Sequence, residues 1–455
     1  MILTRDKKFY TSLVKLAIPM ILQNLITFCV TLADNLMIGS LGDTVVSGVY
    51  MASQLQTVLQ VLSMGIESTI LLIASQYWGK NDTASVRKII SSAFPFALFL
   101  GLLFTVTSAI TPTGVISIFT PEIAVREKGA EYLAIVCYSY FFFCITQMLI
   151  SSMRSVQSAG IGMAVSLVSL VVNVGLNYVL IFGKFGFPEL GIKGAAIATL
   201  TARIVEMIVT VIYVRFFDRK LKIRPKHLLH IDKTILKDLL RYGAPIMAGQ
   251  IVWGTNLFAN SIIMGQFEES VIAATSVANT IYNLMYVCLN GVSGAVGVII
   301  GKTVGSGKLD KIREYAHTVE IIFVVIGLMT SAAFYLLCDP FISFYNISPD
   351  AVETSRQFIH LVCITCIGSC YQCGCLFGLV KSGGDVSFVF KNDAIHIFLI
   401  VLPSAILARY LGAAPWIVFV LLKSDQILKC FVAFFKIRKF NWMKSLTKKP
   451  DEKPA

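Results

Sequence analysis

This chain has 455 residues, of which 56% are hydrophobic and only 14% are charged, and its mean hydropathy is +0.75. Soluble domains have about a quarter charged residues, so the composition excludes a soluble protein and predicts an integral membrane protein. The formal net charge of +13 fits contact with anionic lipids, and we expect no nucleic-acid partner.

Twelve apolar stretches fill most of the chain, and each has the length of about 20 residues that a helix needs to cross a bilayer. They predict an all-α integral membrane protein with twelve transmembrane helices. In chain order the predicted spans cover residues 15–38, 46–76, 89–110, 130–151, 161–183, 192–214, 242–264, 272–301, 315–338, 356–380, 392–411 and 414–435.

The chain also contains an internal repeat. A set of positions recurs 226 residues later with the same residue type, which pairs the first six spans with the last six. Six spans return the chain to the same side, so the two six-helix lobes are expected to be related by a pseudo-two-fold axis along the membrane normal. The first members of the repeated pairs are Pro19, Ala33, Gly39, Ala52, Gly65, Gly79 and Arg87.

Basic residues divide the loops into two sets. The loops on one side, with both ends of the chain, contain 30 of the 39 Lys and Arg residues, so this side is predicted to be cytoplasmic. We expect a multi-pass protein of the cell membrane with both termini inside. The predicted organisation is an N-terminal lobe at 1–217, a cytoplasmic linker at 218–241, a C-terminal lobe at 242–438 and a tail at 439–455.

Polar side chains form stripes on several predicted spans. On the first span Gln23, Thr27, Thr31 and Asp34 recur at i, i+4, i+8 and i+11, so they share one helical face. Polar groups are costly in lipid and usually face a hydrated interior. We therefore expect a substrate cavity lined by Gln23, Thr27, Thr31, Tyr138, Asn256, Asn260, Asn279, Tyr282 and Asn283.

Asp34 is the acidic residue of the first stripe. A carboxylate at this depth can take up and release a proton, or can hold Na⁺ together with carbonyl oxygens. The alternative is a structural carboxylate that neighbouring hydroxyl groups satisfy. The alignment of the stripe favours an ion-coupling role.

Glu67 lies on the second span, and Arg203 and Glu206 lie at i and i+3 on the sixth, at similar depth. Charges inside a membrane usually persist as pairs, so an Arg203–Glu67 or an Arg203–Glu206 ion pair is one interpretation. The other is that these three residues form an inner gate or a second protonation site.

The last two spans contain further charged residues. Asp393 lies at the start of the eleventh span, and Lys423, Asp425 and Lys429 lie in the twelfth. Because Asp425 and Lys429 are spaced at i and i+4, they can form an ion pair on one helix. We interpret this group as a structural network.

Enzyme motifs such as H-E-x-x-H and G-x-S-x-G do not occur, so we expect no catalytic residue. The tenth span contains several cysteines, but one straight helix cannot place four thiolates around a tetrahedral metal ion. We therefore expect neither a metal site nor a cofactor. The cysteines in question are Cys363, Cys366, Cys370, Cys373 and Cys375.

Several motifs, in this order and spacing, resemble those of the multidrug and toxic compound extrusion (MATE) family over essentially the whole chain. Such a transporter exports amphipathic, often cationic compounds by alternating access, in exchange for H⁺ or Na⁺. The resemblance therefore implies a secondary active exporter with a small-molecule substrate. The motifs are Ala33-Asp34-Asn35, Gln76-Tyr77-Trp78-Gly79-Lys80, Arg154-Ser155-Val156-Gln157, the segment 173–183, the segment 191–199 and Gly383-Gly384-Asp385.

The resemblance also implies an ion site. The first-span acid of the family matches Asp34, and a sixth-span hydroxyl matches Thr199. An asparagine and an aspartate of DinF-type members match Asn173 and Asn177, so the second acid is missing. NorM-type members have two acidic residues on the seventh and tenth spans, where this chain has Trp253 and Cys370. The ion site is thus closer to the DinF type.

Pro19 and Pro245 occupy the first span of each half, where a proline frees a backbone carbonyl and lets a gating helix bend. We expect a monomer in the lipid bilayer. The alternative function within the same superfamily is a flippase for lipid-linked saccharides. A flippase would need several Arg and Lys residues in its cavity to bind phosphate.

Overall fold

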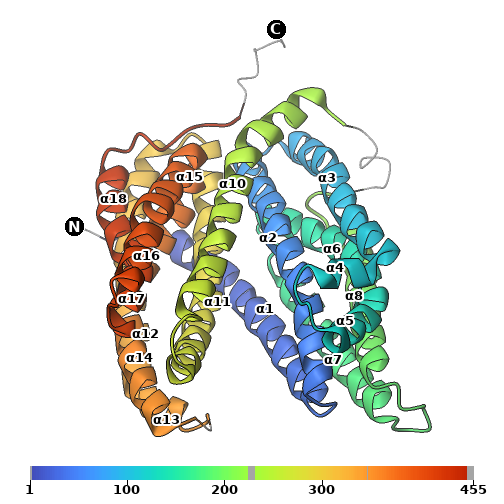
Figure 1. Cartoon of the computed structure of the whole chain (residues 1–455). Helices are drawn as coiled ribbons and strands as arrows, with labels where there is room; N and C mark the ends of the chain where they lie inside the picture. Colours follow the sequence, from blue (N-terminus) through green and yellow to red (C-terminus); the bar gives the residue numbers. More distant parts are fainter. Residues whose placement is uncertain (1–2, 224–230, 346, 448–455) are drawn as a thin grey trace. The chain divides into compact units, whose positions relative to one another are not determined.

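The chain is built from helices (Figure 1). The computed structural model describes residues 3–223, 231–345 and 347–447, and within these ranges the regular secondary structure is helical throughout. All twelve predicted spans lie on helices, so the predicted all-α fold is confirmed. The helices of the first half are α1 (Lys7–Gly39), α2 (Asp43–Gly79), α3 (Thr83–Ile110), α4 (Pro112–Ser117), α5 (Ile123–Val136), α6 (Tyr138–Ser155), α7 (Gly160–Phe182), α8 (Ile192–Ile212) and the π-helical η1 (Tyr213–Phe217).

The second half repeats this order with more interruptions. Two π-helical segments continue the helices before them, and the last predicted span is broken between Leu422 and Asp425. The helices are α10 (Lys233–Met264), α11 (Glu269–Gly305), α12 (Leu309–Leu336), α13 (Cys338–Ile342), α14 (Pro349–Gln372), η2 (Cys373–Lys381), α15 (Val386–Ile395), η3 (His396–Val401), α16 (Leu402–Tyr410), α17 (Pro415–Leu422) and α18 (Asp425–Arg438).

Among the described residues, nine helical segments are long and apolar enough to cross a membrane on their own. The fourth predicted span consists of α5 and α6, which pass the same test together but are bent by 51°. The remaining two predicted spans are α10 and the broken pair α17–α18. Helix α10 begins at Lys233, before the predicted start at residue 242, because the Asp232 carboxylate accepts hydrogen bonds from the Thr234 and Ile235 backbone N–H groups at 3.0 and 3.3 Å.

The chain divides into two compact units. One unit combines the N-terminal segment up to Ile21 with the chain from Ala244 onward, and the other comprises Leu22–Gly243. The chain therefore passes between the units within α1 and within α10. These are the helices that contain the repeated prolines, Pro19 and Pro245.

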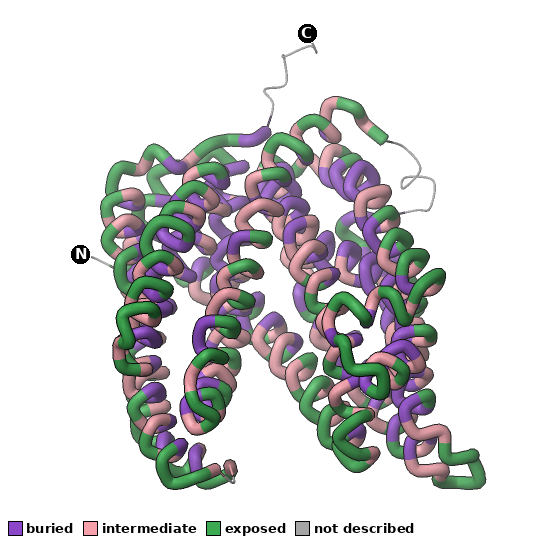
Figure 2. The backbone as a smooth tube through the Cα atoms, in the orientation of Figure 1, coloured by how far each residue is buried: buried purple, intermediate pink, exposed green. Residues whose placement is uncertain are grey.

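Each unit has its own apolar interior. Along most helices buried and exposed residues alternate with the helical period, as Figure 2 shows. In the second half, for example, the Phe358 and Phe419 rings stack with centroids 4.3 Å apart and an interplanar angle of 3°. Such packing fixes α14 against α17 and positions the polar groups on both.

A close pair of helices, α7 and α8, supports the polar centre of the first half. Gly183 ends α7 with φ at +61°, a conformation that suits glycine. The Leu190 backbone N–H then donates a hydrogen bond of 2.9 Å to the Leu180 carbonyl. Gly194 lies directly against that carbonyl, where a Cβ atom would come within 2.5 Å of its oxygen. A side chain at this position would push the two helices apart.

The segment that follows α18 packs on the turn before α15. Trp442 is fully buried, and a Cβ atom on Gly383 would lie 2.3 Å from its ring. Asp385 forms ion pairs of 2.7 Å with both Lys436 and Lys444. Partial burial by itself would raise the pKa of Asp385, but the two ammonium groups outweigh it and hold that pKa below its usual value.

Candidate functional site

Asp34 on α1 and two asparagines on α7 form the polar centre of the first half. The Asn177 amide donates a hydrogen bond to the Asp34 carboxylate, and Asn173 also bonds to that carboxylate. The Asn177 amide further donates to the Asn173 side-chain oxygen at 3.3 Å. Both asparagines are buried, while Asp34 is half-buried. Three of the four residues expected to couple ions are therefore in one cluster.

The fourth expected residue, Thr199 on α8, is connected through a tyrosine. The buried Tyr132 of α5 forms a side-chain hydrogen bond with Thr199, and it lies close enough to Asp34 to interact electrostatically. Sequence reasoning did not single out Tyr132. The predicted fourth span, 130–151, includes Tyr132 but not the bend between α5 and α6. Tyr132 lies before that bend, on α5, and no polar stripe was predicted around it.

Arg203, one turn after Thr199 on α8, pairs with Glu206 at 2.8 Å and lies 5.1 Å from the centre of the Phe143 ring. Of the two ion pairs considered for Arg203, the structure contains the one with Glu206. The pairing with Glu67 is wrong, because Glu67 faces Arg154 instead. Arg203 still interacts electrostatically with Asp34, which links this pair to the polar centre.

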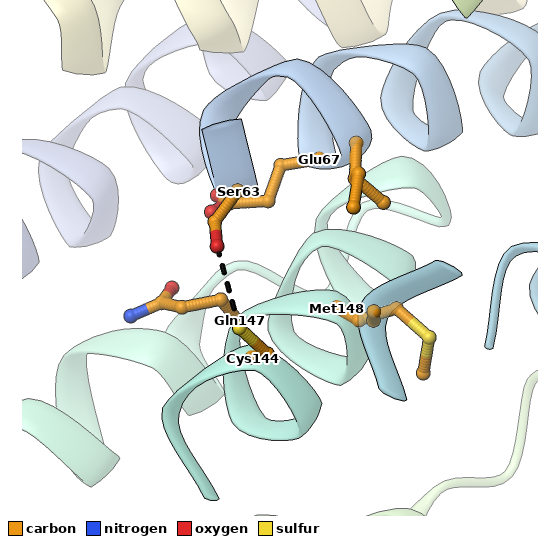
Figure 3. Close-up of a pocket in the computed structure, with 7 residues that line it drawn as sticks. Ser63, Glu67, Cys144, Gln147 and Met148 are labelled. Carbon is orange, nitrogen blue, oxygen red and sulfur yellow. Dashed lines mark hydrogen bonds between the residues drawn. The ribbon is translucent and has the colours of Figure 1, made fainter. Parts of the chain in front are cut away.

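Glu67 belongs to a second buried cluster. Its carboxylate lies 3.8 Å from the Arg154 guanidinium of α6. Arg154 in turn donates a hydrogen bond of 2.8 Å to the side-chain oxygen of Gln23 on α1. Arg154 follows the predicted fourth span, which ends at residue 151, but it lies in the last turn of α6 and is mostly buried. Figure 3 shows the small cavity beside Glu67.

Other residues of the first-half stripe have local partners. The Thr27 hydroxyl donates to the Gln23 backbone carbonyl at 3.0 Å, and the Thr31 hydroxyl donates to the Thr27 carbonyl at 3.2 Å. Thr31 is exposed, and so is Tyr138, at 50% of its surface. These side chains are on the surface of their unit.

The expected cavity residues of the second half lie on α10 and α11. The Asn260 amide donates to the Asn256 backbone carbonyl at 2.8 Å. Tyr282 stacks on Tyr286 with centroids 6.0 Å apart and an interplanar angle of 15°. Lys423 covers Tyr282, with its ammonium 4.2 Å from the ring centre. The remaining two residues of the expected set, Asn279 and Asn283, are half-buried and exposed respectively.

The charged group of the last two spans forms a network, as expected. Lys429 bridges two buried carboxylates, with Asp425 at 3.0 Å and Asp393 at 2.9 Å. The expected i, i+4 pair between Asp425 and Lys429 is confirmed. Lys423 instead lies over an aromatic ring.

The chemistry available to the Asp34 cluster is the binding of a proton or a small cation by a carboxylate with amide neighbours, whereas the buried carboxylates of the other clusters face cationic side chains. Within the described ranges, the structure contains no group of three or more His, Cys, Asp or Glu side chains arranged to hold a metal ion. The cysteines of α14 and η2 are free thiols.

Comparisons with known proteins agree with the internal repeat of the chain. The MatE family profile matches the chain twice, over residues 19–179 and 245–407, and the starts of the two matches are 226 positions apart (245 − 19). That spacing is the spacing of the internal repeat.

Similar proteins cover most of the chain. A probable multidrug resistance protein NorM of Thermotoga maritima is 25% identical over 77% of this chain and 75% of its own length. The protein of the same description in Listeria monocytogenes is 23% identical over 92% of both chains. The crystal structure of the Vibrio cholerae MATE transporter VcmN in the bent form has the same fold, with a TM-score of 0.84, 17% identity, and coverage of 95% of this chain and 97% of that one.

Proposed function

Because this chain belongs to the MatE family, we propose that it is a secondary active exporter of small amphipathic, often cationic compounds, and that it exchanges them for H⁺ or Na⁺ by alternating access. The names of its relatives, which are multidrug resistance proteins, support this substrate class. We further propose that it works in the cell membrane as a monomer, with both termini in the cytoplasm.

The observation that carries the proposal is the carboxylate of Asp34, which is held by the buried amide groups of Asn177 and Asn173. Amide donors fix the position of a carboxylate without neutralising it, so Asp34 remains free to bind a coupling ion. On α7 the family's second acid is replaced by Asn177, which favours a DinF-like site with a single carboxylate. Thr199 belongs to this site through Tyr132.

In the proposed cycle the coupling ion reaches Asp34 from outside and neutralises it. The negative charge that attracts a cationic substrate is then lost, and the substrate leaves. Release of the ion to the cytoplasm restores the charge and lets a new substrate bind. Bending of α1 at Pro19 and of α10 at Pro245 accompanies these steps. Glu67, with Arg203 and Glu206, is proposed as a second protonation site or inner gate.

The flippase alternative is less favoured. A cavity for a phosphate-linked lipid needs several cationic side chains without carboxylate partners. Arg203 and Lys429 are both paired with buried carboxylates, and Arg154 faces Glu67. Lys423 lies against an aromatic ring.

The test is transport of a fluorescent dye cation by purified protein in liposomes, under an imposed pH gradient or an imposed Na⁺ gradient. We expect one gradient to drive transport by the wild type and not by Asp34→Asn. Asp43→Asn is a matched control, because Asp43 is an exposed carboxylate in the first turn of α2. Normal transport by Asp34→Asn would place the coupling site elsewhere, and failure of both gradients with the wild type would refute export of dye cations.

A further inference from the structure

A small cavity inside the first half is bounded by α2, α3 and α6 (Figure 3). Its volume is about 10 Å³, which is close to the smallest space that holds one water molecule. Most of the accessible lining is apolar, but three of the lining residues carry side-chain oxygen atoms. The Ser63 hydroxyl lies 3.6 Å from the Cys144 thiol. The lining residues are Ser63, Ile66, Glu67, Ala97, Cys144, Gln147 and Met148.

The charges beside this cavity are incompletely paired. Glu67 and Arg154 are mostly buried, yet their closest nitrogen–oxygen distance is 3.8 Å, too long for a hydrogen bond. The stronger contact of Arg154 is its hydrogen bond of 2.8 Å to Gln23, and its Nε atom has no hydrogen-bond partner among the residues that the structure describes. A buried carboxylate without a hydrogen-bond donor gains from water or from a proton.

We propose that the Glu67 cavity holds one water molecule and is a second proton-binding site, which acts on α1 through Arg154 and Gln23. The proton joins a carboxylate oxygen of Glu67 and leaves a neutral water molecule behind. The other titratable groups that face Glu67 in the described structure are Arg154 and Cys144, both on α6. This inference deepens the proposed ion coupling and rests on it.

The cavity suits a proton better than a metal cation. Hard cations in proteins are held by about six oxygen ligands, whereas this cavity offers oxygen atoms from Ser63, Glu67 and Gln147. A single water molecule needs only two to four polar partners, and the oxygen atoms of Ser63, Glu67 and Gln147 are the candidates for this role.

The connection to α1 follows from the position of Gln23. Gln23 is one helical turn after Pro19, in the part of α1 that belongs to the same unit as α6 and α7. It is fixed there, because its side chain fills the space beside Gly162, where a Cβ atom would overlap it. Protonation of Glu67 removes the anion that faces Arg154, and an unpaired buried guanidinium is costly. Arg154 then has only the hydrogen bond to Gln23, so a shift of the guanidinium changes that contact. Through Gln23 the change reaches the segment of α1 that follows Pro19.

Infrared difference spectroscopy tests the proposal on purified protein in lipid without any transport. Above about pH 5.5 ordinary carboxyl groups are ionised, since their pKa values are near 4. We expect carboxylic-acid bands from Asp34 and Glu67 in this range. Asp34→Asn should remove one band and Glu67→Gln the other, while Glu131→Gln, a carboxylate paired with Lys128, should change neither.

A Glu67→Gln spectrum identical to that of the wild type would overturn the proposal. So would a Glu67 band that Na⁺ removes at constant pH, because the site would then bind the metal cation. If Glu67→Gln does not fold, Ser63→Val fills the cavity instead, and the proposal requires a changed pH dependence of the Glu67 band. If neither gradient drives transport by the wild type but the Glu67 band is present, the exporter function is refuted while the proton-binding site at Glu67 is supported.

Discussion

Gly194→Ala tests whether the close contact of α7 and α8 supports the polar centre. The new methyl group would meet the Leu180 carbonyl oxygen at 2.5 Å and its carbon at 2.7 Å. These are backbone atoms, and the carbonyl already accepts a hydrogen bond from Leu190. The contact cannot be relieved by turning a side chain, so the two helices must separate.

The size of the effect follows from two opposing terms. Overpacking a well-packed interior costs about 1–3 kcal/mol, and a clash with backbone belongs at the upper end. Alanine regains up to about 1 kcal/mol relative to glycine through helix propensity. We expect a net loss of about 2 kcal/mol. Separation of α7 and α8 should also move Asn177 on α7 away from α8, and should therefore lower gradient-driven transport.

The matched control is Gly175→Ala on α7, where a Cβ atom would meet nothing within 4 Å. That variant should be as stable as the wild type, or more stable by up to about 1 kcal/mol. Thermal unfolding of the purified proteins, in one detergent and lipid mixture, measures the difference. Equal stability of Gly194→Ala and Gly175→Ala would refute the reasoning, because only the former has a backbone atom in its way.

Two further predictions concern the second half. Lys429→Met leaves the buried carboxylates of Asp393 and Asp425 without their cation, so we expect the free energy of unfolding to fall by about 3–5 kcal/mol. Replacing both aspartates by asparagine in this variant should largely restore the stability. An unchanged midpoint of thermal unfolding in Lys429→Met would contradict this. Asp385 has a lowered pKa, so its ion pairs stabilise the fold above its usual pKa and are lost as pH falls through the lowered value. The protection of backbone amides around Trp442 from hydrogen exchange should therefore fall in acid in the wild type. In Asp385→Asn it should already be low at neutral pH. Protection equal to that of the wild type in this variant would show that the ion pairs do not hold the segment.

The helices were predictable because hydropathy and length define a membrane span almost without reference to neighbours. The same reasoning missed how spans are interrupted. The bend between α5 and α6 lies in a stretch that passes the length and hydropathy test as one span, whereas the break between α17 and α18 coincides with the polar residues Lys423, Ser424 and Asp425. A window average cannot detect the bend between α5 and α6, because such a bend depends on packing against other helices.

The site was predictable only in part, for a related reason. The face shared by Gln23 and Asp34 followed from helical spacing within one span. Partners on other helices did not, because they depend on how the helices pack. Tyr132 was not singled out, and Arg154 lies outside the predicted span 130–151, so the pairing of Glu67 with Arg154 was not considered.

The repeat explains why the chemistry is concentrated in one half. At the spacing of 226, Asp34 corresponds to Asn260 and Glu67 to Ser293. Both second-half residues are neutral, and both donate to backbone carbonyls, Asn260 to Asn256 and Ser293 to Cys373 at 2.8 Å. A neutral side chain that donates to a backbone carbonyl stabilises the helices but cannot bind a proton near neutral pH. The two halves thus have the same helical framework. The difference in charge at these two positions favours ion coupling by the first half.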